Sequence, residues 1–125
     1  MKLQEYLSDL GIKYFREIEK ILHSRGLDKD EYSIELSILA DQYSKHQDAN
    51  EKAAEREKEG KPGFYNQFDN GTLQINGYFT MIKESLAVIL KLSPKFGLTP
   101  ADLDKLKNIV GEPKKKSKLQ KLMEK

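Results

Sequence analysis

Lysine is the residue type whose placement offers the clearest chemistry in this sequence. Residues 112–125 hold six lysines and two glutamates, whereas the rest of the chain carries a small excess of acidic groups. Clustered ammonium groups displace counterions from nucleic-acid phosphates with little dependence on base sequence. We therefore predict a flexible basic tail over 112–125 whose DNA contacts come from five side chains: Lys114, Lys115, Lys116, Lys118 and Lys121.

The same tail has two other interpretations. A run of like charges is often only a solvated terminus that keeps a protein soluble. Leu119, Leu122 and Met123 recur with helical spacing, which suits docking on another protein. The pattern leaves DNA contact, protein contact and a solvated terminus open.

A second group of cations recurs with the period of a helix. Over residues 12–24 the apolar residues fall on one side: Tyr14, Phe15, Ile18, Ile21 and Leu22. The opposite side carries Lys13, Arg16 and Lys20, although two glutamates between them dilute the charge. We predict that this basic face is a second candidate for DNA contact, and the alternative is an ordinary solvated face.

The sequence contains few residues that could serve in catalysis or bind a metal ion. The sequence has no cysteine, which excludes disulfides, thiolate metal sites and cysteine nucleophiles. Its two histidines, His23 and His46, lack the glutamate three residues earlier that di-iron helical bundles use. The GKP at 60–62 has proline where a phosphate-binding loop needs serine or threonine. We therefore predict no catalytic residue, no metal and no cofactor.

Apolar runs in the sequence are short. The longest, Leu86 to Leu90, falls far below the roughly 20 residues that a bilayer-spanning helix needs. The first residues also lack the continuous apolar segment of a signal peptide. We expect an intracellular soluble protein with no membrane partner.

Turn-forming residues divide the chain into four predicted helices. Beyond the helix over 12–24, three more are predicted, over about 30–59, over 78–92, and from Thr99-Pro100 to near Gly111. The second half of the long helix is charged nearly all round, so we expect it to project into solvent or against another chain. With a small hairpin, these elements predict a mainly α fold in a single helical domain over residues 1–111.

The hairpin is predicted near residues 64–76. Its Asn70-Gly71 pair can take the left-handed angles of a two-residue type I′ turn, which places Phe68 opposite Leu73. A lone hairpin is marginal in water. We therefore expect its apolar face to pack on a helix, within the chain or in a neighbouring copy.

The third helix carries two apolar stripes. The main stripe holds five residues: Phe79, Ile82, Leu86, Ile89 and Leu90. A second stripe lies to one side, and the long helix likewise has isoleucines off its main stripe. We predict that these off-stripe residues form an oligomer interface: Ile34, Ile38, Met81, Val88 and Leu92. The alternative is that the third helix is simply the central core helix.

The features follow one another in a recognisable order between about Ile34 and Leu106. A long helix with a polar end precedes a hairpin reading NGTLQIN, and an apolar helix then leads to FGLTPADLDKL. This arrangement resembles one family of phage terminase small subunits, whose members commonly end the block with a Gly-Leu-Thr-Pro turn. The specific part is FGLTP at 96–100.

The resemblance implies a non-enzymatic component of the DNA-packaging motor of a tailed phage or prophage, in the cytoplasm of the bacterial host. Such proteins assemble into homo-oligomeric rings, bind double-stranded viral DNA and deliver it to the large terminase subunit, which carries the ATPase and nuclease. Two-sided apolar helices suit a ring, because each subunit offers different surfaces to its two neighbours. The alternatives are a helical regulatory or adaptor protein of a mobile element that binds a protein partner and, with the least support, an enzyme.

Overall fold

The computed structural model describes residues 1–107 and 109, and in this part the chain is mainly helical with one small β-hairpin, as predicted. The elements in chain order are α1 (Asp9–Ser24), η1 (Asp30–Tyr32), α2 (Ser33–Lys58), β1 (Tyr65–Gln67), β2 (Leu73–Ile75), α3 (Gly77–Leu92), η2 (Ser93–Phe96) and α4 (Pro100–Lys107). The η elements are short 3₁₀ helices.

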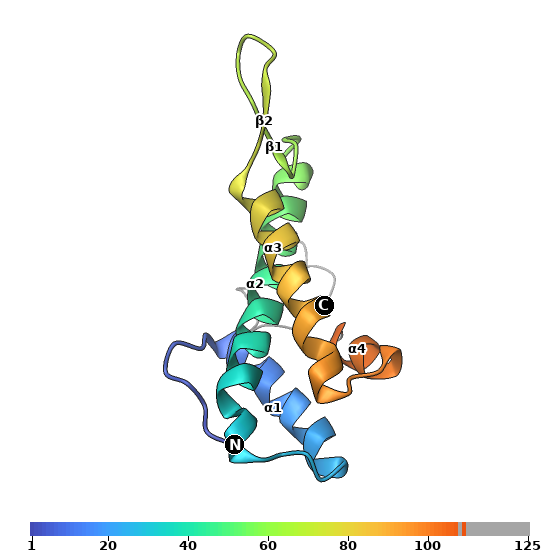
Figure 1. Cartoon of the computed structure of the whole chain (residues 1–125). Helices are drawn as coiled ribbons and strands as arrows, with labels where there is room; N and C mark the ends of the chain where they lie inside the picture. Colours follow the sequence, from blue (N-terminus) through green and yellow to red (C-terminus); the bar gives the residue numbers. More distant parts are fainter. Residues whose placement is uncertain (108, 110–125) are drawn as a thin grey trace, which may run out of the picture.

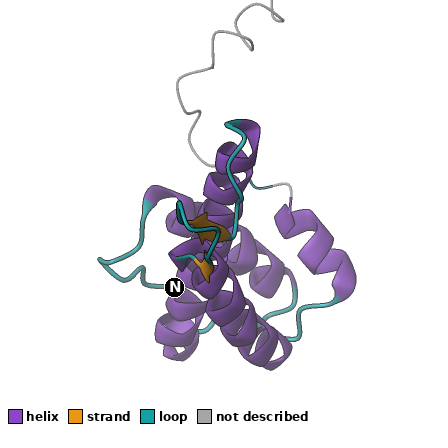
Figure 2. Cartoon of the chain, turned by 90° about the horizontal axis from the view of Figure 1, so that it is seen from above, coloured by secondary structure: helices purple, strands orange, loops and turns teal. Residues whose placement is uncertain are grey.

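The molecule is elongated along an antiparallel pair of helices, α2 and α3 (Figure 1). Helices α1 and α4 lie beside one end of this pair, and the β-hairpin projects from the other end. Viewed along the long axis, the strands lie over the helical body (Figure 2). The charged groups of α1 and α4 and the apolar hairpin are therefore at opposite ends of the molecule.

The hydrophobic core lies at the end where α1 and α4 pack on the helical pair. The apolar stripe predicted for residues 12–24 is confirmed, because its central residues are almost completely inaccessible to solvent. The largest fully buried apolar side chains come from three helices: Phe15, Ile18, Leu22, Leu36, Leu39 and Leu106. This core fixes α1 and α4 relative to α2.

Two stacked tyrosines form a polar layer beside the core. The rings of Tyr14 and Tyr43 lie 5.2 Å apart between centroids and nearly parallel, with an interplanar angle of 13°. The Tyr14 hydroxyl donates to the side chain of Gln47, and the Tyr43 hydroxyl lies 3.2 Å from the Ser93 hydroxyl. Burial raises the pKa of Tyr14 to about 12, so this layer stays uncharged across the physiological range.

The second half of α2 packs against α3 of the same chain (Figure 1), so the prediction that it projects into solvent or against another chain is wrong. Ala49 and Ala53 are buried on α2, and Ser85 is buried on α3. Small side chains let two helices approach closely while the charged residues of α2 point outward. The sequence did not reveal this contact between α2 and α3, because the mean hydropathy of a segment with a few alanines among many charged residues is polar.

The hairpin register differs by one residue from the predicted one. Tyr65 pairs with Ile75 and Gln67 pairs with Leu73, so Phe68 does not lie opposite Leu73. The loop has three residues, 69–71, because the Phe68 amide donates to the Thr72 carbonyl. Only the glycine of the Asn-Gly pair has positive φ (84°), which excludes a type I′ turn and is typical of a type I turn closed by a left-handed glycine.

The buried face of α3 is also turned from the predicted main stripe. Leu86 and Leu90 are exposed, whereas Ser85 and Ile89 are buried and Leu92 packs partly buried against the core. Ser85 can lie in this face because its hydroxyl donates to the Met81 carbonyl at 2.6 Å. Hydrophobic periodicity alone does not detect such a buried serine.

Candidate interaction surfaces

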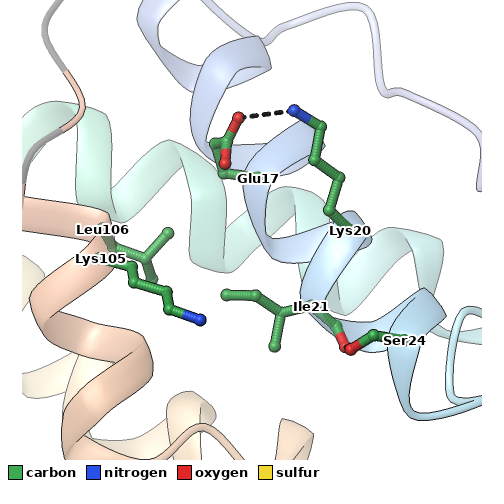
Figure 3. A pocket seen from close by; sticks show the side chains of 6 residues that line it. All are labelled: Glu17, Lys20, Ile21, Ser24, Lys105 and Leu106. Carbon is green, nitrogen blue, oxygen red and sulfur yellow. Dashed lines mark hydrogen bonds and ion pairs between the residues drawn. The ribbon is translucent and has the colours of Figure 1, made fainter.

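A shallow, open groove lies between α1 and α4. It has a volume of about 300 Å³. Two branched apolar side chains, two lysines, one glutamate and one serine line it: Ile21, Leu106, Lys20, Lys105, Glu17 and Ser24 (Figure 3).

The charge of this groove comes from two lysines on different helices. Lys20 forms an ion pair with Glu17 at 3.0 Å, whereas Lys105 forms none with the described residues. In Figure 3, Lys105 extends from α4 toward Ile21 of α1. Lys105 therefore adds a positive charge to the predicted basic face of α1, although it is distant in sequence.

The rest of the predicted α1 face is partly neutralised. Arg16 donates to Glu19 at 2.9 Å, and Lys13 is half-buried. Of the three predicted α1 cations, the structure brings only Lys20 into the groove. Ion pairs between residues three apart are weak and exchange readily for other partners, so these cations stay available to an anion that binds more strongly.

Three further lysines were missed in the sequence because they do not form a run. Lys83, Lys91 and Lys95 are exposed on α3 and η2 and form no ion pair with the described residues. Glu84 is the one acidic residue in those two elements. The scarcity of acids over residues 77–96 is the signal that identifies this surface as basic.

The position of α4 beside the groove is set by Arg25, the residue after α1. Its Nη2 lies 3.0 and 2.8 Å from the two carboxylate oxygens of Asp102, and its Nη1 donates to the Gly97 carbonyl at 3.1 Å. Gly97 has φ 65°, which ends the preceding 3₁₀ helix. One guanidinium thus holds both sides of the FGLTPAD corner.

Asp102 also caps α4. Its carboxylate accepts from the Thr99 amide at 2.8 Å, and the Asp102 amide donates back to the Thr99 hydroxyl at 3.3 Å. This reciprocal arrangement is a capping box with a carboxylate, and α4 begins at Pro100, where the sequence predicts the start of the fourth helix. The hydrogen bond that the Thr99 backbone N–H donates, together with the guanidinium of Arg25, lowers the pKa of Asp102 to about 2.

Comparison with protein families identifies the chain. A family model described as "Phage terminase, small subunit" matches residues 11–112, which is most of the sequence and covers all but the first two residues of α1 and every later element through α4. The chain belongs to the phage terminase small subunit family. Comparisons with curated proteins and with solved structures gave no match.

Two helices of this terminase family member, α2 and α3, carry exposed apolar side chains. Among the predicted interface residues, Ile34 is 63% exposed, Ile38 and Met81 are moderately exposed, and Val88 and Leu92 are partly buried. The structure adds Leu86 and Leu90, which lie on the opposite flank of α3 from Met81 and Val88 by helical geometry. Both flanks of α3 therefore offer apolar side chains to solvent.

The lysines of the predicted basic tail of this family member, Lys114 to Lys121, lie outside the described residues. Within residues 1–107 and 109, no group of three histidine, aspartate or glutamate side chains is placed to hold a metal ion. None of the helices in that part has the length and apolar character needed to cross a bilayer.

Proposed function

We propose that the chain is the small subunit of the packaging terminase of a tailed phage or prophage, working in the cytoplasm of the bacterial host. In this role it binds double-stranded viral DNA, forms a closed homo-oligomer and presents the DNA to the large subunit, which carries the ATPase and nuclease. The observation that carries the proposal is the match to the small-subunit family over residues 11–112, which supports a role in phage DNA packaging.

The proposed DNA contacts combine several lysines, each of them weak alone. Lys20 and Lys105 lie at the α1–α4 groove, and Lys83, Lys91 and Lys95 add positive charge along α3 and η2. The tail lysines contribute further contacts. Repetition of these groups around an oligomer supplies affinity that one copy lacks, because each bound copy raises the effective concentration of the next.

The two apolar flanks of α3 support the proposed assembly. A ring needs two different surfaces on each subunit, and Leu86 and Leu90 lie on one flank while Met81 and Val88 lie on the other. Ile34 and Ile38 extend the apolar surface onto α2. We propose that the subunit itself is non-catalytic, like small terminase subunits in general, and that DNA cleavage and ATP hydrolysis belong to the large subunit.

DNA titration at two salt concentrations tests the function. The wild-type chain should bind duplex DNA, and the affinity should fall by orders of magnitude between about 50 and 200 mM salt if six or more phosphates are contacted. The Lys20→Ala/Lys105→Ala variant should bind at least about tenfold more weakly, with a salt slope smaller by about 2.

A matched control keeps the change in net charge the same. Lys58→Ala/Lys61→Ala removes two exposed lysines near the hairpin end of α2, and its affinity should stay within about twofold of wild type. Absence of wild-type binding at either salt concentration contradicts the proposal and favours an adaptor that binds a protein partner.

A further inference from the structure

The hairpin and the first turns of α3 carry almost no charge, although the charged end of α2 lies at the root of the hairpin. Between residues 62 and 82 the sequence has one charged side chain, Asp69, although 34% of the whole chain is charged. We call residues 62–82 the neutral tip. It has no cation that could bind a DNA phosphate, and its one carboxylate repels DNA.

The neutral tip exposes large apolar side chains on both faces of the hairpin. Tyr65, Leu73 and Ile75 lie on one face and Phe68 on the other, and each is between 44% and 57% exposed. Apolar side chains gathered on a projecting element are typical of a protein–protein interface rather than of a surface that faces water.

The root of the hairpin is held firmly in spite of this exposure. Arg56 of α2 donates to the Pro62 carbonyl at 3.1 Å and to the Tyr65 carbonyl at 3.2 Å. The Asn76 side chain donates to the Gly63 carbonyl at 2.8 Å and caps α3 by accepting from its first amides. Phe64 packs edge-to-face on Phe79, with ring centroids 6.0 Å apart. A rigid root means that little ordering is required when a partner binds.

The two edges of the hairpin are not equivalent. Hydrogen bonds join Phe68 to Thr72 and Asn76 to Phe64, so the alternation of an antiparallel ladder points the backbone groups of Leu73 and Ile75 away from β1. On the β1 edge, the Tyr65 carbonyl is occupied by Arg56. In the described part of the chain, the β2 edge therefore offers its N–H and C=O groups to an added strand.

We propose that the neutral tip is a homotypic contact, in which the β2 edge of one copy accepts a hairpin strand from the tip of a second copy. Charge favours a second copy as the occupant, because two such tips, each with Asp69 as its one charged residue, meet with little repulsion, whereas 34% of the whole chain is charged. Strand addition also covers Leu73 and Ile75, whose side chains are about half exposed to solvent in the isolated chain. The proposal rests on the self-assembly proposed above; it adds a contact at the hairpin to the surfaces on α2 and α3, and this contact is separate from the DNA-binding lysines.

A matched pair of substitutions tests the proposal in the full chain. Leu73→Lys places a charge in the tip, and Leu27→Lys places the same charge at a leucine that is also exposed but lies between α1 and η1. Native mass spectrometry should show wild-type assembly for Leu27→Lys and at least tenfold weaker association for Leu73→Lys. Circular dichroism should show the same helix content for both variants.

Amide hydrogen exchange supplies a readout that does not depend on a substitution. In the wild-type assembly the Leu73 and Ile75 amides should exchange at least tenfold more slowly than in the chain diluted to monomer. The proposal is overturned by any of four results: Leu73→Lys assembles as wild type does, both variants are weakened equally, the Leu73 and Ile75 amides are unprotected, or the wild-type chain stays monomeric. Assembly of Leu73→Lys with loss of binding to the large subunit also overturns it and assigns the tip to that partner.

DNA titration of the same variants separates this inference from the proposed function. Leu73→Lys monomers that still bind DNA through their lysines support the tip as the site of self-association. A wild-type chain that assembles through the tip but binds no DNA supports the tip contact and contradicts the proposed packaging role.

Discussion

The guanidinium of Arg25 holds the carboxylate of Asp102, which is 77 residues later in the chain, through contacts of 2.8 and 3.0 Å. Asp102 is buried and also caps α4 through Thr99, so one carboxylate serves a local and a long-range purpose. The Gly-Leu-Thr-Pro corner at residues 97–100 is therefore a structural joint between α1 and α4. By fixing α4 against α1, the corner positions Lys105 of the groove.

Removal of Arg25 should loosen this joint. Arg25→Ala leaves the buried Asp102 carboxylate with only its Thr99 partners, and we expect the free energy of unfolding to fall by about 2 kcal/mol. Urea unfolding followed by circular dichroism measures the change. Lys29→Ala is the control, because Lys29 is exposed and should alter stability by less than about 0.5 kcal/mol. Equal stabilities for the two variants would refute a structural role for the ion pair.

The same joint should make stability depend on acid pH. The folded pKa of Asp102 is lowered from 3.8 to about 2, so its contribution is complete above about pH 4 and is lost as the pH falls through about 2. Asp102→Asn should be less stable than wild type by about 2 kcal/mol at pH 6, and the difference should shrink toward pH 2. Unfolding curves at pH 6, 4 and 2 check this. A stability difference that is independent of pH contradicts the assignment.

Much of the helical architecture could be predicted from the sequence, because α1, α3 and the start of α4 carry strong local signals. The Gly97 stop and the Thr99-Pro100 start are encoded by conformational and capping preferences that need no partner. The candidate site could be predicted only in part. Lys20 lies on a regular basic face, but its pairing with Lys105 in one groove depends on how α4 packs against α1.

Errors arose where tertiary packing decides between local alternatives. The Asn70-Gly71 pair is compatible with loops of two or three residues, and the three-residue loop shifts the register of Leu73 by one. Likewise, Ser85 is polar in a hydrophobicity plot but is buried; the hydrogen bond from its hydroxyl to the Met81 carbonyl of the same helix satisfies the polar group and makes this burial possible. Neither outcome has a local signature in the residue types.

Gly63 should not tolerate a side chain, because it lies against the end of α2. A Cβ at this position would lie 2.9 Å from the Ala53 carbonyl oxygen and 2.8 Å from the Glu57 carboxylate. The backbone carbonyl cannot move away easily, so Gly63→Ala should lower stability by about 1–3 kcal/mol. Gly77→Ala is the matched control, since a Cβ there meets nothing within 4 Å. Thermal unfolding of both variants gives the answer, and equal melting temperatures count against close packing at the hairpin root.

The basic tail should contribute to the salt dependence of DNA binding. A variant with glutamine at Lys114, Lys115, Lys116, Lys118 and Lys121 should show a salt slope smaller by about 0.9 for each lysine that contacts a phosphate. Fluorescence anisotropy with labelled duplex DNA at several salt concentrations measures this slope. If the salt slope and the affinity are unchanged, the tail does not bind DNA, and the DNA contacts are assigned to the groove lysines and to the lysines of α3 and η2.

Native mass spectrometry at micromolar concentration, with and without duplex DNA, tests the proposed packaging role most directly. We predict one defined homo-oligomer in the absence of DNA and the same oligomer carrying DNA when the duplex is added. A closed assembly gives a single stoichiometry, because its surfaces are saturated when the ring closes. A strict monomer under both conditions would contradict the account.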